Sequence, residues 1–289
     1  MSWVEPSYSR KYAQYCKEDM LDVSFHKCQI SYQGLEFSIS YFIRQGPAPA
    51  LLYLHGVGAS KDDFLGAASY QGLRNYCLVA LDFPGCAGTP YPEDREWGVG
   101  DLVRITDQLT RALDLSDFVI VGHSLGGLVG LLYSHQHPGK VTAFVNIEGN
   151  MSSEDCFLTR PVARLSFSDF LGTQHLQNLR LKFRNAPDNA TRAWAEALGP
   201  QVSPRAFYDY SVSTVDWSDK QDLLAMFSAL PVPRLFIYGS VNSHLSYLAR
   251  LRQSDAVVVE VSDSGHWPHL DNPEFFYRVV GQFLSSRTE

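Results

Sequence analysis

The chain has 289 residues, 45% hydrophobic and 19% charged, which suits one large folded domain and argues against a disordered or fibrous protein. Lys and Arg number 24 against 31 Asp and Glu, and the resulting net charge of −7 argues against binding to nucleic acid or to an anionic membrane surface. Residues 1–15 lack the basic flank and apolar run of a signal peptide, and no apolar run is long enough to span a membrane. These features predict a soluble, cytoplasmic protein.

Short apolar runs end at Gly, Pro or polar residues and alternate with longer amphipathic segments. This alternation is typical of a parallel sheet with helices on both faces. The first two runs alternate polar and apolar residues around Gln33-Gly34, which predicts an antiparallel hairpin. The predicted strands are 23–32, 35–43, 50–54, 77–82, 117–121, 141–147, 234–238 and 256–261.

Apolar residues at three- and four-residue spacing predict helices between these strands. The predicted helices are 61–74, 98–113, 125–136, 243–253 and 272–284. The alternation breaks once, since residues 152–230 contain no strand-like run and are rich in aromatic residues at helical spacing. We therefore expect an α/β core made of residues 1–150 and 231–289, with residues 151–230 inserted as a helical lid.

The five cysteines are odd in number and widely spaced, which predicts reduced thiols and no zinc site. Cys77 falls in an apolar strand and is expected to pack in the core. His135 and His137 have no third ligand in register, and the Gly56–Gly58 loop lacks the lysine of a phosphate-binding loop. The sequence therefore predicts neither a metal nor a cofactor.

The run Gly-His-Ser-Leu-Gly at 122–126 follows a predicted strand and precedes a predicted helix. This is the G-x-S-x-G pattern of a nucleophile elbow, in which glycines on both sides permit a strained, exposed serine. The helix N-terminus also directs backbone N–H groups towards developing negative charge. Ser124 is therefore the candidate nucleophile.

A candidate base lies near the end of the chain. His266 follows the predicted strand 256–261, at the edge of the sheet where α/β proteins hold their ligands. A neutral imidazole can accept a serine proton near neutral pH and return it to a leaving group. His269, three residues further on, is interpreted as structural or exposed.

A third motif, Leu-His-Gly-Val-Gly at 54–58, also follows a strand. Its glycines would allow a turn that directs the Val57 N–H towards the same region as the Leu125 N–H. These two amides are the candidate oxyanion hole.

Together the segments 54–58, 82–85, 122–126 and 265–268 resemble the lidded α/β-hydrolases, and the likeness extends from about residue 25 to residue 284. The resemblance implies an α/β-hydrolase fold, with Ser124 as nucleophile, His266 as base and the amides of Val57 and Leu125 as the oxyanion hole.

The acid of the triad departs from the common pattern of that family. Most members place it after the strand that follows the lid, where this chain has Asn242, and an amide cannot supply the required charge. Members resembling haloalkane dehalogenases and zearalenone-type lactone hydrolases place it after the strand before the lid, where this chain has Glu148. Glu148 is the predicted acid. Asp263 and Asp216 are its rivals, and Glu148 could instead bind only backbone or a lid arginine.

An apolar cleft under an aromatic lid favours a hydrophobic carboxylic ester or lactone as substrate. The serine elbow argues against a dehalogenase, which needs a carboxylate nucleophile. C–C hydrolases, hydroxynitrile lyases and cofactor-free haloperoxidases share the framework and remain alternatives, as does a non-catalytic small-molecule receptor. The sequence does not indicate an oligomeric state.

Overall fold

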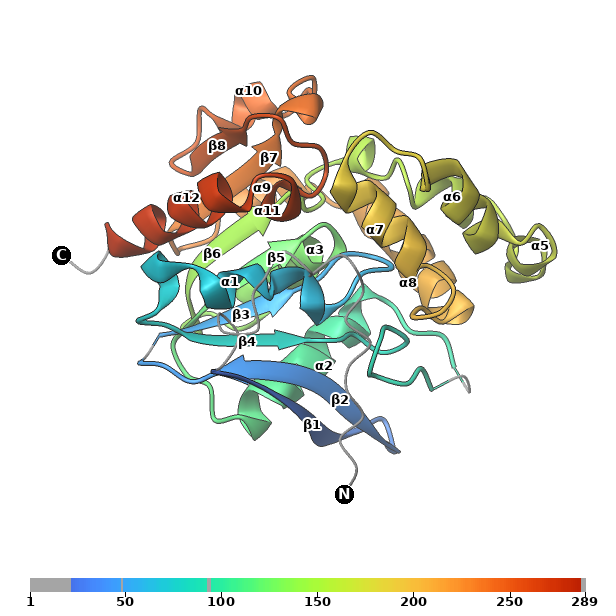
Figure 1. The fold of residues 1–289 in the computed structure, drawn as a ribbon, viewed down its shortest axis with the longest axis horizontal. Coiled ribbons are helices and arrows are strands. Elements are labelled where there is room, and N and C mark those ends of the chain that lie inside the picture. Colours follow the sequence, from blue (N-terminus) through green and yellow to red (C-terminus); the bar gives the residue numbers. More distant parts are fainter. Residues whose placement is uncertain (1–21, 48, 93–94, 287–289) are drawn as a thin grey trace.

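The computed structural model describes residues 22–47, 49–92 and 95–286, so the predictions about residues 1–15 lie outside it. Eight strands form one sheet in the order β1-β2-β4-β3-β5-β6-β7-β8 (Figure 1). They are β1 Val23–Tyr32, β2 Leu35–Arg44, β3 Ala50–Leu54, β4 Cys77–Leu81, β5 Phe118–His123, β6 Val141–Ile147, β7 Arg234–Gly239 and β8 Val257–Val261. The β1-β2 and β2-β4 pairs are antiparallel and all other pairs are parallel. The predicted α/β class and mostly parallel sheet of about eight strands are confirmed.

The predicted hairpin joins β1 to β2. Gln33 and Gly34 have φ values of 52° and 81°, as a two-residue hairpin turn requires at both central positions. Tyr32 pairs with Leu35 on either side of the turn.

The sheet separates two apolar layers. Along β3, Leu52 and Leu54 pack in the layer that contains side chains of α2 (Val99–Ala112) and α3 (Leu125–Gln136). Leu51 and Tyr53 point to the opposite layer, which contains side chains of α12 (Pro273–Ser285). This alternation follows from the two-residue period of a strand, and it explains why the central strands are apolar throughout.

The remaining helices are short, except α8. They are η3 Lys61–Phe64, α1 Gly66–Ser69, η4 Gln71–Leu73, η5 Ser153–Asp155, α4 Arg160–Ala163, α5 Phe167–Gly172, α6 His175–Phe183, α7 Asn189–Ala197, α8 Pro204–Lys220, α9 Leu223–Ser228, η6 Ser240–Asn242, α10 Leu248–Leu251 and α11 Pro268–Asp271.

The prediction of one helix over 61–74 is wrong, because the segment divides into η3, α1 and η4. Tyr70 ends α1 in an extended conformation, with ψ at 120°. Buried Lys61 lies at the start of the segment. Its backbone N–H donates to the carboxylate of Asp82, directly after β4, at 2.9 Å, and its ammonium group donates to the same carboxylate at 2.8 Å. This tertiary pairing and the turn at Tyr70 take precedence over the helical spacing.

The helix predicted over 243–253 is also shorter, since only Leu248–Leu251 forms α10. Residues before it make hydrogen bonds to Glu148, after β6, and to Glu154, in the cap segment, instead. Asn242 in η6 donates to the Glu148 carboxylate at 2.7 Å, and the Ser246 N–H donates to Glu154 at 3.0 Å.

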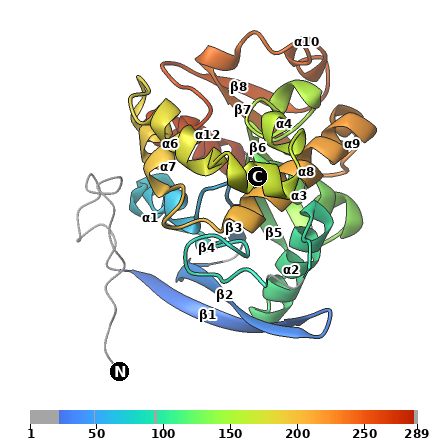
Figure 2. The same ribbon diagram turned by 90° about the vertical axis from the view of Figure 1, so that its right-hand side faces the viewer.

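Residues 151–230, here called the cap segment, run between β6 and β7 and contain η5 and α4 to α9. Viewed from its side of the molecule, the cap segment lies in front of the sheet (Figure 2). Several of its aromatic side chains are buried in packing, as expected: Phe170, Trp194, Phe207, Tyr210 and Phe227. Phe157 differs, with an exposed fraction of 54%.

Candidate active site

Ser124 lies at the bend between β5 and α3. Its backbone has φ 52° and ψ −118°, a strained conformation for a residue with a side chain. The bend requires small neighbours, because a Cβ on Gly122 would lie 2.4 Å from the Gly126 carbonyl oxygen and one on Gly126 would lie 2.1 Å from the Leu54 carbonyl oxygen. The Ser124 N–H donates to the Ile147 carbonyl at 2.9 Å, which ties the bend to β6.

His266 lies on the loop between β8 and α11. Its Nδ1 is 2.9 Å from Oε2 of Glu148, and the two side chains are only 9% and 4% exposed. A carboxylate in this position fixes the Nδ1–H tautomer and leaves Nε2 able to accept a proton.

Glu148 follows β6 with a positive φ of 50°. Its Oε1 accepts from the Gly239 N–H at 2.7 Å, and its Oε2 accepts from the Asn242 side-chain amide at 2.7 Å. With His266, these donors hold both carboxylate oxygens in place. Asn242, at the family's usual acid position, therefore contacts Glu148 directly, a contact that sequence reasoning did not predict.

The rival carboxylates lie elsewhere. Asp263 is exposed on the loop after β8. Asp216 forms an ion pair with Lys220 at 2.5 Å on the outside of α8. The structure thus brings Glu148, and neither rival, to within hydrogen-bonding distance of His266.

Val57 and Leu125 line one small cavity together with Ser124 and His266. The Val57 loop follows β3 and is fixed from two sides. Buried His55 contacts the Gly56 carbonyl through Nδ1 at 2.8 Å and accepts from the Phe83 N–H through Nε2 at 2.9 Å. From the cap segment, the Trp194 indole N–H donates to the Val57 carbonyl at 3.0 Å.

His123, next to the nucleophile, supports the His266 loop. Its Nε2 lies 2.8 Å from the His266 carbonyl oxygen. Burial, with the neighbouring His269 and His266, holds the pKa of His123 well below its usual value. Its ring is therefore neutral near pH 7, and Nε2–H is the donor in this hydrogen bond. His269 is fully buried and lies against Phe64, which agrees with the structural part of its interpretation.

Residues 51–279 match the family model described as the alpha/beta hydrolase family, and this match covers all the candidate site residues. The chain belongs to the α/β-hydrolase family. Its fold resembles that of a carboxylesterase of Nitrososphaera gargenis, with a TM-score of 0.74, 19% identity and coverage of 90% of this chain and 99% of the other.

Two proteins that bear enzyme names are also similar in sequence. An sn-1-specific diacylglycerol lipase of Xenopus tropicalis is 23% identical, with 94% of this chain and 88% of the relative covered. The 2-hydroxy-6-oxo-6-(2'-aminophenyl)hexa-2,4-dienoic acid hydrolase of Metapseudomonas resinovorans is 26% identical, with 86% and 88% covered. A specific likeness to dehalogenases or lactone hydrolases, expected from the acid position, remains a prediction.

The α/β-hydrolase cavity also contains a carboxyl group that sequence reasoning missed. Asp155 accepts from the Met151 and Ser152 N–H groups at 2.8 Å and 2.9 Å and from the Tyr247 hydroxyl at 2.8 Å. Burial raises its pKa to about 6 despite these donors. No sequence motif marked Asp155, because its environment comes from the distant α10 region as well as from its own turn.

Across the described ranges, no helix of this α/β-hydrolase is long and apolar enough to cross a membrane. In the same part of the chain, His, Cys, Asp and Glu side chains form no cluster of three that could hold a metal ion. Cys28, Cys77, Cys86 and Cys156 are free thiols, and Cys77 is buried as expected, whereas Cys16 lies outside the described residues.

Proposed function

We propose that this α/β-hydrolase is a serine hydrolase that cleaves a carboxylic ester or lactone of an apolar small molecule through an acyl-enzyme. The main support is the buried 2.9 Å contact between His266 and Glu148 beside the cavity that Ser124 lines. Val57, Leu125, Phe157 and Leu158 form the apolar part of the cavity lining, beside the polar residues Asn150, Asp155, Thr159 and Thr214. An uncharged ester suits this apolar part of the lining better than a charged group does.

The reaction begins when Nε2 of His266 takes the Ser124 hydroxyl proton and the serine oxygen attacks the carbonyl carbon. The carbonyl electron pair moves onto oxygen, where the N–H groups of Val57 and Leu125 stabilise the negative charge. Glu148 stabilises the imidazolium. When the tetrahedral intermediate collapses, the C–O bond to the alcohol breaks and the alcohol receives the proton from His266.

Water then attacks the acyl group on Ser124. His266 accepts a proton from this water and returns it to the serine oxygen as the acyl C–O bond breaks. The products are a carboxylic acid and free enzyme, and the cycle uses no cofactor.

Replacing Ser124 with Ala tests this function. We expect hydrolysis of p-nitrophenyl esters to fall by about 10⁴- to 10⁶-fold, since loss of one member of a triad disables the unit. A fluorophosphonate probe should label the wild-type protein at Ser124 and should not label the variant. Undiminished turnover by a folded variant, confirmed by circular dichroism, would contradict the proposal.

A C–C hydrolase is the second candidate, because the relative from Metapseudomonas resinovorans bears the name of a dienoic acid hydrolase. In that case wild-type protein would cleave a vinylogous diketone acid faster than matched aryl esters. A panel containing both substrate classes, assayed with the Ser124→Ala variant as blank, separates the two reactions.

A further inference from the structure

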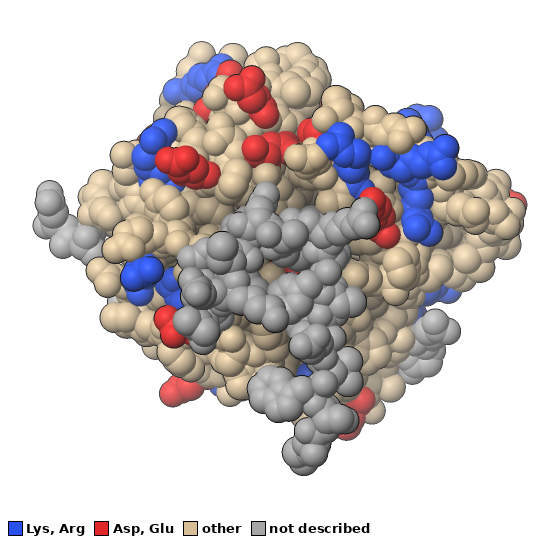
Figure 3. All heavy atoms as spheres, in the orientation of Figure 1, with Lys and Arg blue, Asp and Glu red and all other residues tan. Residues whose placement is uncertain are grey.

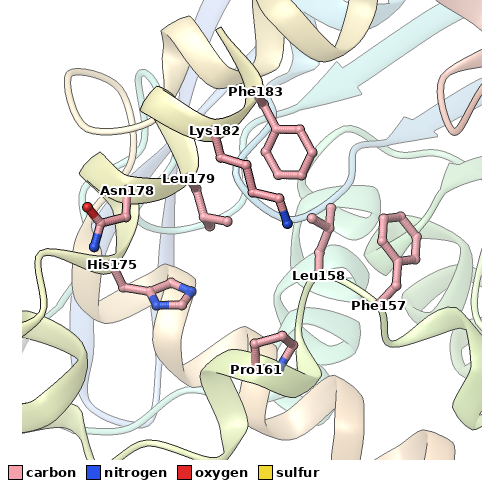
Figure 4. Close-up of a pocket in the computed structure, with 8 residues that line it drawn as sticks. All are labelled: Phe157, Leu158, Pro161, His175, Asn178, Leu179, Lys182 and Phe183. Carbon is pink, nitrogen blue, oxygen red and sulfur yellow. The ribbon is translucent and has the colours of Figure 1, made fainter. Parts of the chain in front are cut away.

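A groove lies in the cap segment, outside the catalytic cavity that Ser124 lines. It has a volume of about 320 Å³ and lies between α4 and α6 (Figure 4). Its apolar lining consists of Phe157, Leu158, Pro161, Leu179 and Phe183. This volume lies within the range of sites for small molecules, about 300–1,000 Å³.

The groove and the catalytic cavity adjoin. Phe157 and Leu158 line both the groove and the catalytic cavity. The Phe157 ring stands edge-on against the His266 ring, at 5.1 Å between centroids and 88° between planes. A substrate chain that passes these two side chains would run from Ser124 into the groove.

Polar groups gather at the far side of the groove, on α6. Figure 4 shows the Lys182 side chain directed into the groove between Leu158 and Leu179. The Lys182 ammonium lies 4.9 Å from the centre of the Phe183 ring. None of the described residues that line the groove is Asp or Glu, so the groove offers one positive charge and no negative one.

His175 adds an unused polar atom. Its Nε2 is buried and has no hydrogen-bond partner among the described residues. Burial lowers the pKa of His175, so the ring is neutral near pH 7 and adds no second charge. One ammonium group beside neutral polar groups matches a single negative charge, such as a carboxylate, better than a phosphate monoester with nearly two.

We propose that this groove binds the distal end of the substrate, an apolar chain that ends in a carboxylate, and that Lys182 selects for that charge while the ester carbonyl lies at Ser124. The inference rests on the proposed function, since it places the reacting carbonyl at Ser124. It adds a substrate class, namely esters whose acyl chain carries a terminal carboxylate.

The test compares mono-p-nitrophenyl esters of dicarboxylic acids, from adipate to sebacate, with uncharged p-nitrophenyl alkanoates of equal length and with the acetate. Lys182→Met should lower kcat/KM for the best carboxylate ester by about fivefold to tenfold, as expected for a partly exposed charge pair. The values for alkanoates and acetate should change by less than about twofold. Raising the salt concentration should reduce the difference.

Arg180→Met is the matched control. It removes the same charge from the same helix, but Arg180 lines a different groove with Arg184 and Glu196. An equal loss in both variants would show a general field effect and overturn the proposal, as would no loss in Lys182→Met.

If wild-type protein hydrolyses no ester, including the acetate, the proposed function fails and the groove is tested by binding. Calorimetry then measures the affinity of the Ser124→Ala protein for the intact carboxylate ester, with and without Lys182→Met. Weaker binding in the double variant supports the carboxylate site, and equal binding contradicts it.

Discussion

Asn242 occupies the position at which most related enzymes carry the acid of the triad, and here it contacts Glu148, the proposed acid. Asn242 donates to Glu148, and Glu148 contacts His266, so the two candidate positions lie side by side. Both contacts are made through the same oxygen of Glu148, Oε2, so positions 148 and 242 lie on the same side of the imidazole.

We expect Glu148→Gln to lower kcat by about 10³- to 10⁴-fold, because an amide can favour the wrong imidazole tautomer and carries no charge. Asn242→Ala should cost only about tenfold, since the Gly239 N–H still holds Glu148. Steady-state kinetics with a p-nitrophenyl ester measures both.

The double variant Glu148→Gln/Asn242→Asp restores one carboxylate at the neighbouring position. We expect it to recover at least about tenfold of the activity lost in Glu148→Gln, in line with the non-additivity of neighbouring sites. A mild effect of Glu148→Gln together with a severe effect of Asn242→Ala would contradict the assignment.

Residues with a local motif could be predicted from the sequence, and those defined by distant contacts could not. Ser124 has glycines on both sides and a strand before it, so the chain around it reveals its bend. Asn242 and His123 act through contacts with Glu148 and the His266 carbonyl, which are distant in sequence. For Asn242, the absence of an acid at this position is the one signal that the sequence offers.

At the scale of elements, the loop that carries Val57 contacts a helix of the cap segment. Trp194 on α7 donates to the Val57 carbonyl, and a Cβ on Gly58 would lie 2.8 Å from the Leu198 side chain and 3.1 Å from the Trp194 indole nitrogen. The loop is therefore packed directly beneath α7. We infer that the position of α7 affects the alignment of the Val57 N–H.

Trp194→Phe removes the indole donor and keeps most of the ring. We expect kcat for p-nitrophenyl acetate to fall by about twofold to tenfold, which corresponds to one neutral hydrogen bond. Trp217→Phe on α8 is the control and should change kcat by less than twofold. The assay uses the acetate so that a change in the binding of long acyl chains does not enter. Equal rates for the two variants would contradict the coupling.

The strands were predicted well because a buried parallel strand is apolar at every position, as in β3, and this pattern is strong even over five residues. The segments 61–74 and 243–253 were predicted less well. Apolar residues do recur there at helical spacing. However, Lys61 contacts Asp82 at the start of the first segment, and Asn242, just before the second, contacts Glu148. Such tertiary contacts override local periodicity and leave no trace in the spacing of apolar residues.

For the molecule as a whole, charge is distributed unevenly. The net charge is −7, yet Arg180, Lys182 and Arg184 are all exposed at the end of α6. Basic side chains also gather over α6 and α7 in the space-filling view (Figure 3). This local excess of positive charge favours approach of an anionic substrate to the cap segment.

Two buried carboxyl groups should make stability depend on pH. Burial raises the pKa of Asp155 and of Asp271 to about 6, well above the usual value of an aspartate. Because the pKa is higher in the folded state, the folded protein binds more protons than the unfolded chain does. The resulting contribution to the free energy of unfolding is complete below about pH 4 and is lost as the pH rises through 6.

Asp155→Asn should therefore make the protein more stable relative to wild type at pH 7.5 than at pH 5, by about 1.4 kcal/mol. The asparagine oxygen can keep the two backbone donors of Met151 and Ser152, while its amide faces the Tyr247 hydroxyl. Urea unfolding at both pH values measures the difference. A stability difference that does not change with pH would contradict the raised pKa.

The acyl-enzyme is the intermediate on which the whole account depends. Rapid mixing of wild-type protein with a p-nitrophenyl ester, followed by an acid quench and mass spectrometry of peptides, measures it directly. We expect a burst of about one p-nitrophenol per active site when deacylation is slow, with the acyl mass on the peptide that contains Ser124. Steady turnover with the acyl mass on another residue, or with no acylated peptide at any quench time, would contradict it.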